Sequence, residues 1–258
     1  VNELIGQISQ QAFAKKNSVT VVLVDDASTE RPDKLLLATH TKEHFTVELM
    51  SLNRNIGHQR AIAIGLACIA EKGIFDCVVV MDADGEDRVE DISKLLDEIR
   101  RHDPPPIVFA RRSRRTEGLL FRAGYSLFKF VHWMLTGKGC DVGNFSVIPS
   151  QWLQPLVHSP ELWNHYAASV LSSKLPILKV PCPRGQRISG KSHMNTTALV
   201  VHGLRAISVF GETVGVRVSL ALGFFIILAL LNLAVIIYIK TATLLAIPGW
   251  ATNAAGLS

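Results

Sequence analysis

The chain has 258 residues, a formal net charge of +5 and a hydrophobic content of 48%. That length accommodates one sizeable α/β domain with an appendage, and the modest charge, without a known nucleic-acid motif, argues against a nucleic-acid partner. The four cysteines are scattered without metal-ligand spacing, so we expect reduced thiols in a cytoplasmic domain.

The first 110 residues alternate between patterns that are typical of helices and of buried strands. Strand and helix in alternation predict an α/β fold with a doubly wound, mostly parallel sheet and flanking helices. The predicted helices are 1–16, 58–72 and 89–101, and the predicted strands are 19–24, 47–52, 78–81 and 107–110.

The segment after residue 110 changes character. A basic loop that begins at Arg111 is followed by residues 119–135, which carry many aromatic side chains. This segment can lie in a membrane interface or form a core helix beneath the sheet, and its pattern leaves both open. Further predictions are a turn into a strand at 141–148, a helix at 161–171, a strand at 175–180 and an amphipathic helix at 195–213.

Residues 218–239 contain no charged side chain. At ~1.5 Å rise per residue, a helix of this length crosses a bilayer, so we predict a transmembrane helix. Arg205 and Arg217 precede this segment and Lys240 follows it. By the positive-inside tendency, we expect the globular domain to face the cytoplasm at the inner membrane.

Two predicted strands end in carboxylates. Asp82 and Asp84 follow one strand, and Asp25 and Asp26 end another. Ligands of open α/β sheets bind outside the carboxyl ends of the strands, and paired oxygen ligands suit Mg²⁺ or Mn²⁺ beside substrate phosphates. The alternatives are a solvated acidic turn for the first pair and helix capping for the second, which Ser28 can perform equally well.

Several motifs occur in one order along the chain: Asp25-Asp26-Ala-Ser28, Asn53-Arg54-Asn55-Ile-Gly57, Asp82-Ala-Asp84-Gly-Glu86-Asp87, Arg187-Ile-Ser-Gly190-Lys191-Ser192, an apolar span, and Pro248-Gly249-Trp250. Together they resemble the family 2 glycosyltransferases of GT-A fold, in particular the branch that makes polyprenyl-phosphate sugars. The resemblance covers nearly the whole chain. It implies a Rossmann-like nucleotide-diphospho-sugar transferase sheet followed by a C-terminal transmembrane helix.

The resemblance also assigns roles. Asp82 and Asp84, assisted by Glu86, would hold Mg²⁺ or Mn²⁺ against the donor diphosphate. Asp25 or Asp26 would contact the nucleotide, and Asn55 and Gly57 belong to the same donor site. Candidates for the acceptor phosphate and the donor pyrophosphate are Arg111, Arg112, Arg114, Arg115, Arg187, Lys191 and Ser192.

The implied reaction moves a sugar from a UDP- or GDP-sugar to a polyprenyl phosphate with inversion at the anomeric carbon. An acceptor phosphate is already ionised at neutral pH, which agrees with the lack of an obvious catalytic dyad. We therefore interpret His58, His132, His165 and His193 as structural. Membrane lipid is an expected partner, and a homo-oligomer is possible.

The chain departs from relatives at both ends. Relatives begin with a strand that helps to bind the nucleotide, and they usually carry a second membrane helix after the Pro-Gly-Trp turn, so we suspect an incomplete chain. Asn144 falls where many relatives have an acidic residue. The expected parts are a catalytic domain at 1–194, a juxtamembrane helix at 195–215, a transmembrane helix at 216–240 and an interfacial turn with a truncated second span at 241–258.

Two other functions stay open. One is a family 2 transferase with another lipid or glycan acceptor, although Gln186-Arg187 does not continue into the Gln-x-x-Arg-Trp motif of processive synthases. The other is a membrane-tethered protein that binds sugar nucleotides without catalysis.

Overall fold

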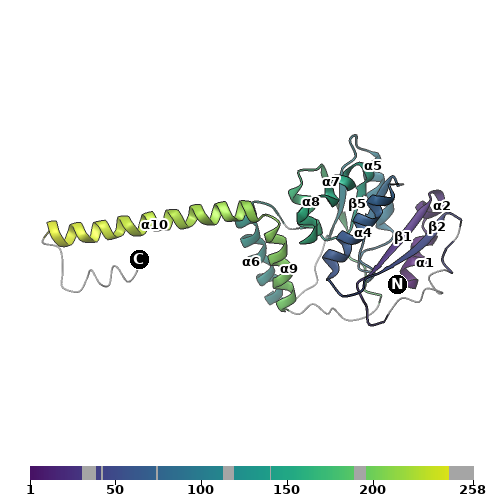
Figure 1. Ribbon diagram of the computed structural model, residues 1–258, viewed down its shortest axis with the longest axis horizontal. Coiled ribbons are helices and arrows are strands. Elements are labelled where there is room, and N and C mark those ends of the chain that lie inside the picture. The colour runs from purple at the N-terminus through teal and green to yellow at the C-terminus, as the bar shows by residue number, and fades with distance from the viewer. Residues whose placement is uncertain are drawn as a thin grey trace. The chain divides into compact units, whose positions relative to one another are not determined.

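The computed structural model describes residues 1–30, 39–41, 43–73, 75–112, 119–139, 141–188 and 196–243. Its chain forms two compact units, Val1–Val209 and Phe210–Ser258. The first unit mixes helices and strands, which confirms the predicted α/β class (Figure 1).

The strands of the first unit form two sheets. Strand β1 (Val19–Asp25) pairs in parallel with β2 (Phe45–Ser51). The second sheet has the order β3-β5-β4-β6. Its strands are β3 (Cys77–Val80), β5 (Ser146–Pro149), β4 (Ile107–Arg112) and β6 (Ile177–Cys182). Strands β4 and β6 are parallel, as predicted, whereas β5 runs antiparallel to both of its neighbours.

The helices around the second sheet follow the sequence closely. Helix α4 (His58–Lys72) has the predicted bounds, and it ends at Gly73, whose φ of 67° is the left-handed conformation that glycine adopts freely. Helix α5 (Asp91–Arg100) is shorter than predicted at both ends. The predicted helix at 161–171 is instead a 3-10 helix, η1 (Pro160–Trp163), and α8 (Tyr166–Ser172).

Two helical regions differ from the sequence analysis, one near the N-terminus, where the prediction was wrong, and one after β5, where no helix was predicted. One continuous helix over 1–16 was expected, but the chain forms α1 (Asn2–Gln10) and α2 (Ala12–Lys16). Gln11 separates them because its backbone is extended, with ψ at 149°. Helix α7 (Ser150–Val157) was not predicted, and Pro155 inside it obscured the helical pattern.

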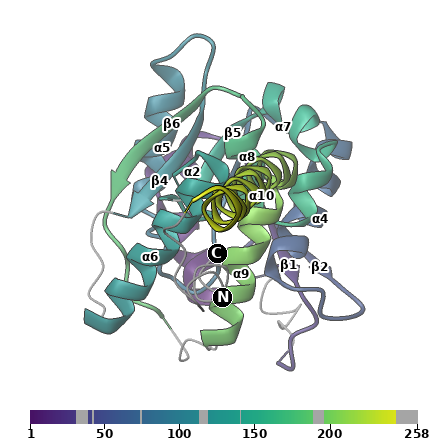
Figure 2. The ribbon, with the colours of Figure 1, turned by 90° about the vertical axis from the view of Figure 1, so that its left-hand side faces the viewer.

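Alternate side chains of β4 fill two different cores, because successive residues of a strand point to opposite faces. Val108 lies in a core with Leu95 of α5. Ile107 and Phe109 lie in a second core with helices α4, α7 and α8, where Tyr166 is fully buried. Figure 2 shows these helices beside the strands. Helices thus cover both faces of the second sheet, and the loops that follow its strands lie at the sheet's edges.

Helices α6 (Leu119–Thr136) and α9 (Thr196–Ser208) pack against each other. The contact is close, since a Cβ at Gly203 would lie 2.6 Å from the Phe128 ring. Helix α9 was expected to extend to residue 213, but it ends at Ser208.

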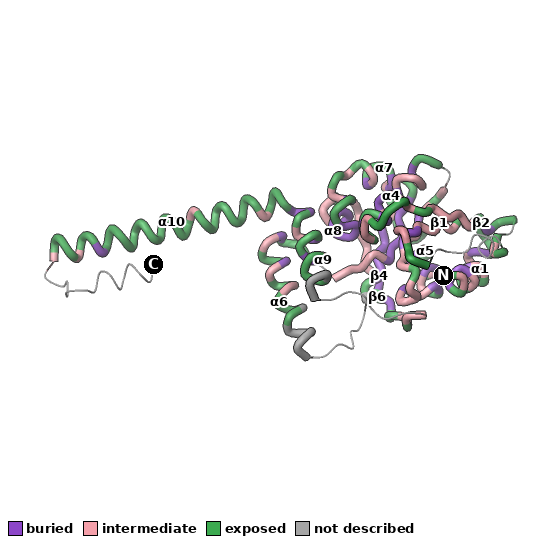
Figure 3. Tube along the Cα trace, turned by 60° about the horizontal axis from the view of Figure 1, so that its bottom comes forward, coloured by how far each residue is buried: buried purple, intermediate pink, exposed green. Residues whose placement is uncertain are grey.

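The second unit contains α10 (Gly211–Ala242), a helix of 32 residues that includes an 18-residue stretch with a mean hydropathy of 2.9. Nearly all of its side chains are exposed (Figure 3). At ~1.5 Å per residue it is longer than the ~30 Å hydrocarbon core of a bilayer, so it is long and apolar enough to cross a membrane.

Candidate active site at the strand ends

The acidic segment after β3 forms a tight turn. The backbone N–H of Asp82 donates to the Asp87 carboxylate at 3.0 Å, and the N–H of Glu86 donates to Asp84 Oδ1 at 2.9 Å. Gly85 has a φ of +84°, which allows the chain to reverse here. The turn therefore presents several carboxylates just beyond the end of one strand.

A second loop, which follows β6, lies directly on this turn. The N–H of Gly185 donates to the Glu86 carbonyl at 2.8 Å, and the N–H of Ile188 donates to the Asp84 carbonyl at 2.9 Å. Neither Gly85 in the turn nor Gly185 in the second loop can carry a side chain without a collision. A Cβ at Gly185 would lie 2.6 Å from the Gly85 carbonyl oxygen, and a Cβ at Gly85 would overlap Ile188.

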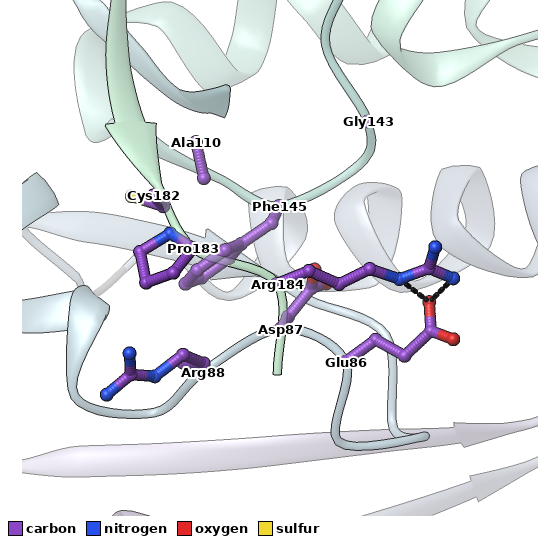
Figure 4. Close-up of a pocket in the computed structure, with 9 residues that line it drawn as sticks. All are labelled: Glu86, Asp87, Arg88, Ala110, Gly143, Phe145, Cys182, Pro183 and Arg184. Atoms are coloured by element: carbon purple, nitrogen blue, oxygen red, sulfur yellow. Dashed lines mark hydrogen bonds and ion pairs between the residues drawn. The ribbon is translucent and has the colours of Figure 1, made fainter. Parts of the chain in front are cut away.

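Ion pairs also join the two loops, between carboxylates of the turn and arginines of the loop after β6. Arg187 Nη2 lies 2.9 Å from Asp84 Oδ2 and 3.3 Å from Glu86 Oε1. Arg184 approaches the other Glu86 oxygen at 2.6 Å (Figure 4). The structure thus brings together three predicted site residues from two distant segments, and it adds Arg184, which the motif pattern did not single out.

The Asp82 carboxylate is bound by Asn144, which lies in the loop before β5. Asn144 Nδ2 donates to Asp82 Oδ1 at 3.2 Å, and Gln59 Nε2 donates to Asn144 Oδ1 at 3.1 Å. Gln59 lies at the start of α4 and is only 1% exposed. No sequence signal pointed to Gln59, and Asn144 stood out only as a departure from relatives.

The acidic end of β1 shapes the neighbouring loop. Both Asp26 oxygens accept backbone N–H groups, from Ile56 at 2.7 Å and from Gly57 at 2.8 Å. Asp25 Oδ1 accepts the N–H of Ser28 at 3.0 Å, while its Oδ2 is buried with no hydrogen-bond partner among the described residues. Asn55 is exposed beside them. Asp26 therefore fixes the loop, and Asp25 has one oxygen without a hydrogen-bond partner among the described residues.

The remaining basic candidates are less fully described. Arg111 Nη1 lies 4.0 Å from Asp141 Oδ2, and Lys179 Nζ lies 2.5 Å from Asp141 Oδ1. The backbone of Arg112 ends β4. The other basic-loop candidates, Arg114, Arg115, Lys191 and Ser192, lie outside the described residues, as does His193.

Three histidines, His58, His165 and His202, form a cluster that contacts Gln59 through His58 Nε2. His165 Nε2 lies 3.2 Å from His202 Nε2, and the rings of His58 and His202 stack with centroids 5.5 Å apart. Burial lowers the pKa of His165 to about 3 and that of His202 to about 4, each helped by the neighbouring imidazoles. Both are neutral at pH 7. His165 also caps α8 through the N–H of Ala168.

The carboxylates fit a divalent cation in part. No group of three or more His, Cys, Asp or Glu side chains that could hold a metal occurs among the described residues. Mg²⁺ commonly takes one or two carboxylates and completes its shell with water and substrate phosphates, which suits Asp82 and Asp84. Glu86 fits less well as a ligand, because both of its oxygens face guanidinium groups.

A small cavity lies beside the turn. It has a volume of about 10 Å³ and is lined by side chains that include Phe145, Cys182 and Arg184 (Figure 4). A volume of this size holds at most about one water molecule.

Carboxylates and arginines gather at the strand ends of this α/β domain, where ligands of open α/β sheets bind. The model of "Glycosyl transferase family 2" matches residues 1–153, and the chain belongs to this family. It is therefore a glycosyltransferase, as the motif order indicated.

Relatives agree with the family. The chain is 27% identical over 250 residues to an undecaprenyl-phosphate 4-deoxy-4-formamido-L-arabinose transferase of Edwardsiella ictaluri. The matched region covers 90% of this chain and 73% of that protein. An enzyme of the same name from Salmonella choleraesuis is 19% identical over 231 residues, 83% of this chain and 68% of the relative. One from Pseudomonas aeruginosa is 32% identical over 95 residues, 37% of this chain and 27% of the relative.

Proposed function

We propose that the protein transfers a sugar from a nucleotide-sugar donor, a UDP- or GDP-sugar, to a polyprenyl phosphate, with inversion at the anomeric carbon. The observation that carries this proposal is the contact between Asp84 and Arg187, because it joins an acidic and a basic motif at one point. The named activity of the relatives, on undecaprenyl phosphate, supports the choice of acceptor.

In this proposal Asp82 and Asp84 hold Mg²⁺ or Mn²⁺ beside the donor diphosphate. When bound, such a cation neutralises the charge that develops on the departing nucleoside diphosphate. Glu86 acts differently from the expectation: it positions Arg184 and Arg187 by ion pairs. The two arginines then face the anionic groups that enter the site.

The donor nucleotide lies against the end of β1. The unpartnered buried Oδ2 of Asp25 is an acceptor for a base or ribose donor. Asp26 holds the loop that contains Asn55 and Gly57, so this loop is positioned before the ligand arrives. A preorganised loop loses less conformational entropy when a ligand binds.

The acceptor supplies its own nucleophile. A phosphate monoester is ionised at neutral pH, so its oxygen attacks the anomeric carbon without a strong general base. We assign Arg111, Arg114, Lys191 and Ser192 to the acceptor phosphate and the donor pyrophosphate. Arg111 has a side chain that is 53% exposed at the end of β4, which leaves it accessible to an anion.

Membrane attachment would bring the acceptor to this site. Helix α10 would cross the bilayer, and along the chain only Val209 and Phe210 separate it from α9. Exposed apolar side chains of α6 and α9 are suited to the interface: Leu127, Phe130, Trp133, Met134, Val200, Val201 and Leu204. Because Arg205 and Arg217 lie before the apolar segment, we place the catalytic domain at the cytoplasmic face of the inner membrane.

The experiment supplies the full chain, in detergent or membranes, with undecaprenyl phosphate, Mg²⁺ or Mn²⁺, and a panel of UDP- and GDP-sugars. Mass spectrometry detects lipid-linked sugar, with and without a chelator. A product lost on chelation supports the complete proposal and names the donor. A product that survives chelation removes the metal from it, and no product with any donor favours another acceptor or a binding role.

A further inference from the structure

A continuous line of hydrogen bonds runs from the core to Asp82. The backbone N–H of Tyr166 donates to Gln59 Oε1 at 2.6 Å. Gln59 Nε2 donates to Asn144 Oδ1 at 3.1 Å, and Asn144 Nδ2 donates to Asp82 Oδ1 at 3.2 Å. The line joins α8, α4, the loop before β5 and the end of β3.

The direction of every bond in this line is fixed by chemistry. A backbone N–H can only donate, so the Gln59 oxygen must face Tyr166 and its amide nitrogen must face Asn144. An ionised carboxylate can only accept, so Asn144 must turn its nitrogen toward Asp82. Neither amide can flip without placing two acceptors against each other. The orientation at the carboxylate is thereby set from the core.

Gln59 is also rigid. It is 1% exposed, and its amide nitrogen lies 2.9 Å from His58 Nε2. His58 stacks on His202, which contacts His165. A buried side chain with this many partners has little rotational freedom, so it is a firm support for the next residue along the line.

We propose that Gln59 and Asn144 are positioning residues that fix the Asp82 carboxylate for the divalent cation. This inference rests on the proposed function for its chemistry. Asn144 acts directly on the carboxylate, and Gln59 acts only through Asn144. Partners behind a metal ligand typically contribute about 10–100-fold to metal affinity or activity.

The test uses Gln59→Glu, which keeps the acceptor for Tyr166 and removes the donor for Asn144. Asn144→Ala and the double variant complete a cycle. The matched control is Gln154→Glu, because the Gln154 amide nitrogen also donates to a carbonyl oxygen, that of Ala70, but Gln154 is exposed on α7 and is not part of the line. Mn²⁺ binding to the full chain in detergent, with a nucleoside diphosphate present, is followed by electron paramagnetic resonance, and thermal unfolding reports on the fold.

We expect each single variant to weaken Mn²⁺ binding by about 10–100-fold, with the double variant no weaker than Asn144→Ala and the control unchanged. An affinity loss in the double variant equal to the product of the two single losses would show that Gln59 does not act through Asn144. Losses that follow the thermal midpoint in all variants would reduce both residues to structural roles.

A second readout does not depend on the metal. With ¹⁵N-labelled asparagine, the side-chain resonance of Asn144, assigned by its loss in Asn144→Ala, is expected to shift in Asp82→Asn and in Gln59→Glu. An unmoved resonance in both variants overturns the proposal. If the wild-type protein binds no Mn²⁺ but this resonance moves as expected, the metal assignment fails while the hydrogen-bonded line stands.

Discussion

The guanidinium of Arg187 lies 2.9 Å from the Asp84 carboxylate, although Asp84 follows β3 and Arg187 follows β6, the last strand of the chain that the structure describes. Arg187 thus neutralises the charge of the Asp84 carboxylate, which we propose to bind a divalent cation. The same arginine contacts Glu86, so both acidic side chains share one basic partner.

Asp84→Asn is expected to lower transfer by at least about 100-fold, because it removes a charge that binds the cation. The turn should persist, since an amide oxygen still accepts the Glu86 N–H. Steady-state product formation measures the loss, and Asp97→Asn, in an exposed ion pair with Arg100, is the control. Near-normal turnover in Asp84→Asn would remove this residue from the metal site.

Arg187→Ala is expected to have opposite effects on two ligands. Without the guanidinium, Asp84 and Glu86 attract Mn²⁺ more strongly in the absence of donor, whereas donor binding weakens because a cation facing the diphosphate is lost. Mn²⁺ titration and the donor KM measure the two effects.

Arg184→Ala is the matched control for Arg187, because Arg184 pairs with Glu86, whereas Arg187 pairs with both Glu86 and Asp84. It should therefore change Mn²⁺ affinity less. Equal effects of the two substitutions on Mn²⁺ affinity would contradict a specific role for the contact between Arg187 and Asp84.

Gly85→Ala is expected to disrupt the contact between the two loops. Its φ of +84° strains any side chain, and the added Cβ collides with Ile188. Gly73→Ala has similar backbone strain, with a φ of 67°, but no atom within 4 Å of the new Cβ. Strain alone costs about 1–2 kcal/mol, and overpacking adds about 1–3 kcal/mol.

Thermal unfolding and activity together measure this difference. Gly73→Ala should lower the thermal midpoint slightly and leave transfer intact, whereas Gly85→Ala should lower both. Shortening the opposing side chain with Ile188→Ala should restore part of the activity of Gly85→Ala. No restoration would indicate that backbone strain, not the collision, causes the defect.

Stability should fall as the pH decreases below about 6.5. The unfolded histidines bind protons near their ordinary pKa of 6.5, whereas His165 and His202 stay neutral in the folded chain until about pH 3 and 4. The unfolded state therefore binds more protons across this window, and at pH 5 each histidine costs about 2 kcal/mol.

The thermal midpoint between pH 7 and pH 5 checks this expectation. His165→Asn keeps an acceptor for the N–H of Ala168 and removes one titrating group, so its midpoint should vary less with pH. His102→Asn, at an exposed position, should behave as the wild type. An unchanged pH dependence in His165→Asn would show that the cluster does not control acid stability.

Trp133 is expected to lie at the membrane surface, whereas Trp163 is expected to lie in water. Both rings are substantially exposed, at 58% and 45%. In bilayers with brominated acyl chains, Trp133→Phe should remove quenchable fluorescence, and Trp163→Phe should remove only unquenched fluorescence. The reverse result would place the exposed face of α6 away from the lipid.

The sequence by itself determined the local elements with strong periodicity and the family. Helix α4 was predicted with its observed bounds, because its helical pattern is followed by Gly73, and glycine commonly ends a helix. The paired carboxylates after β3 were visible because an apolar run stops abruptly in charge. The antiparallel direction of β5 was not visible, since a short buried strand has the same pattern in either direction.

Only the tertiary structure decided which residues meet. Asn144 is 85 positions from Gln59 and 62 positions from Asp82 along the chain. No local pattern links an amide to a carboxylate at such a distance. Arg184 and Arg187 face Glu86 because Gly85 and Gly185 allow two loops to touch. Such contacts depend on how the sheet and its helices pack, so they appear only when the chain is folded.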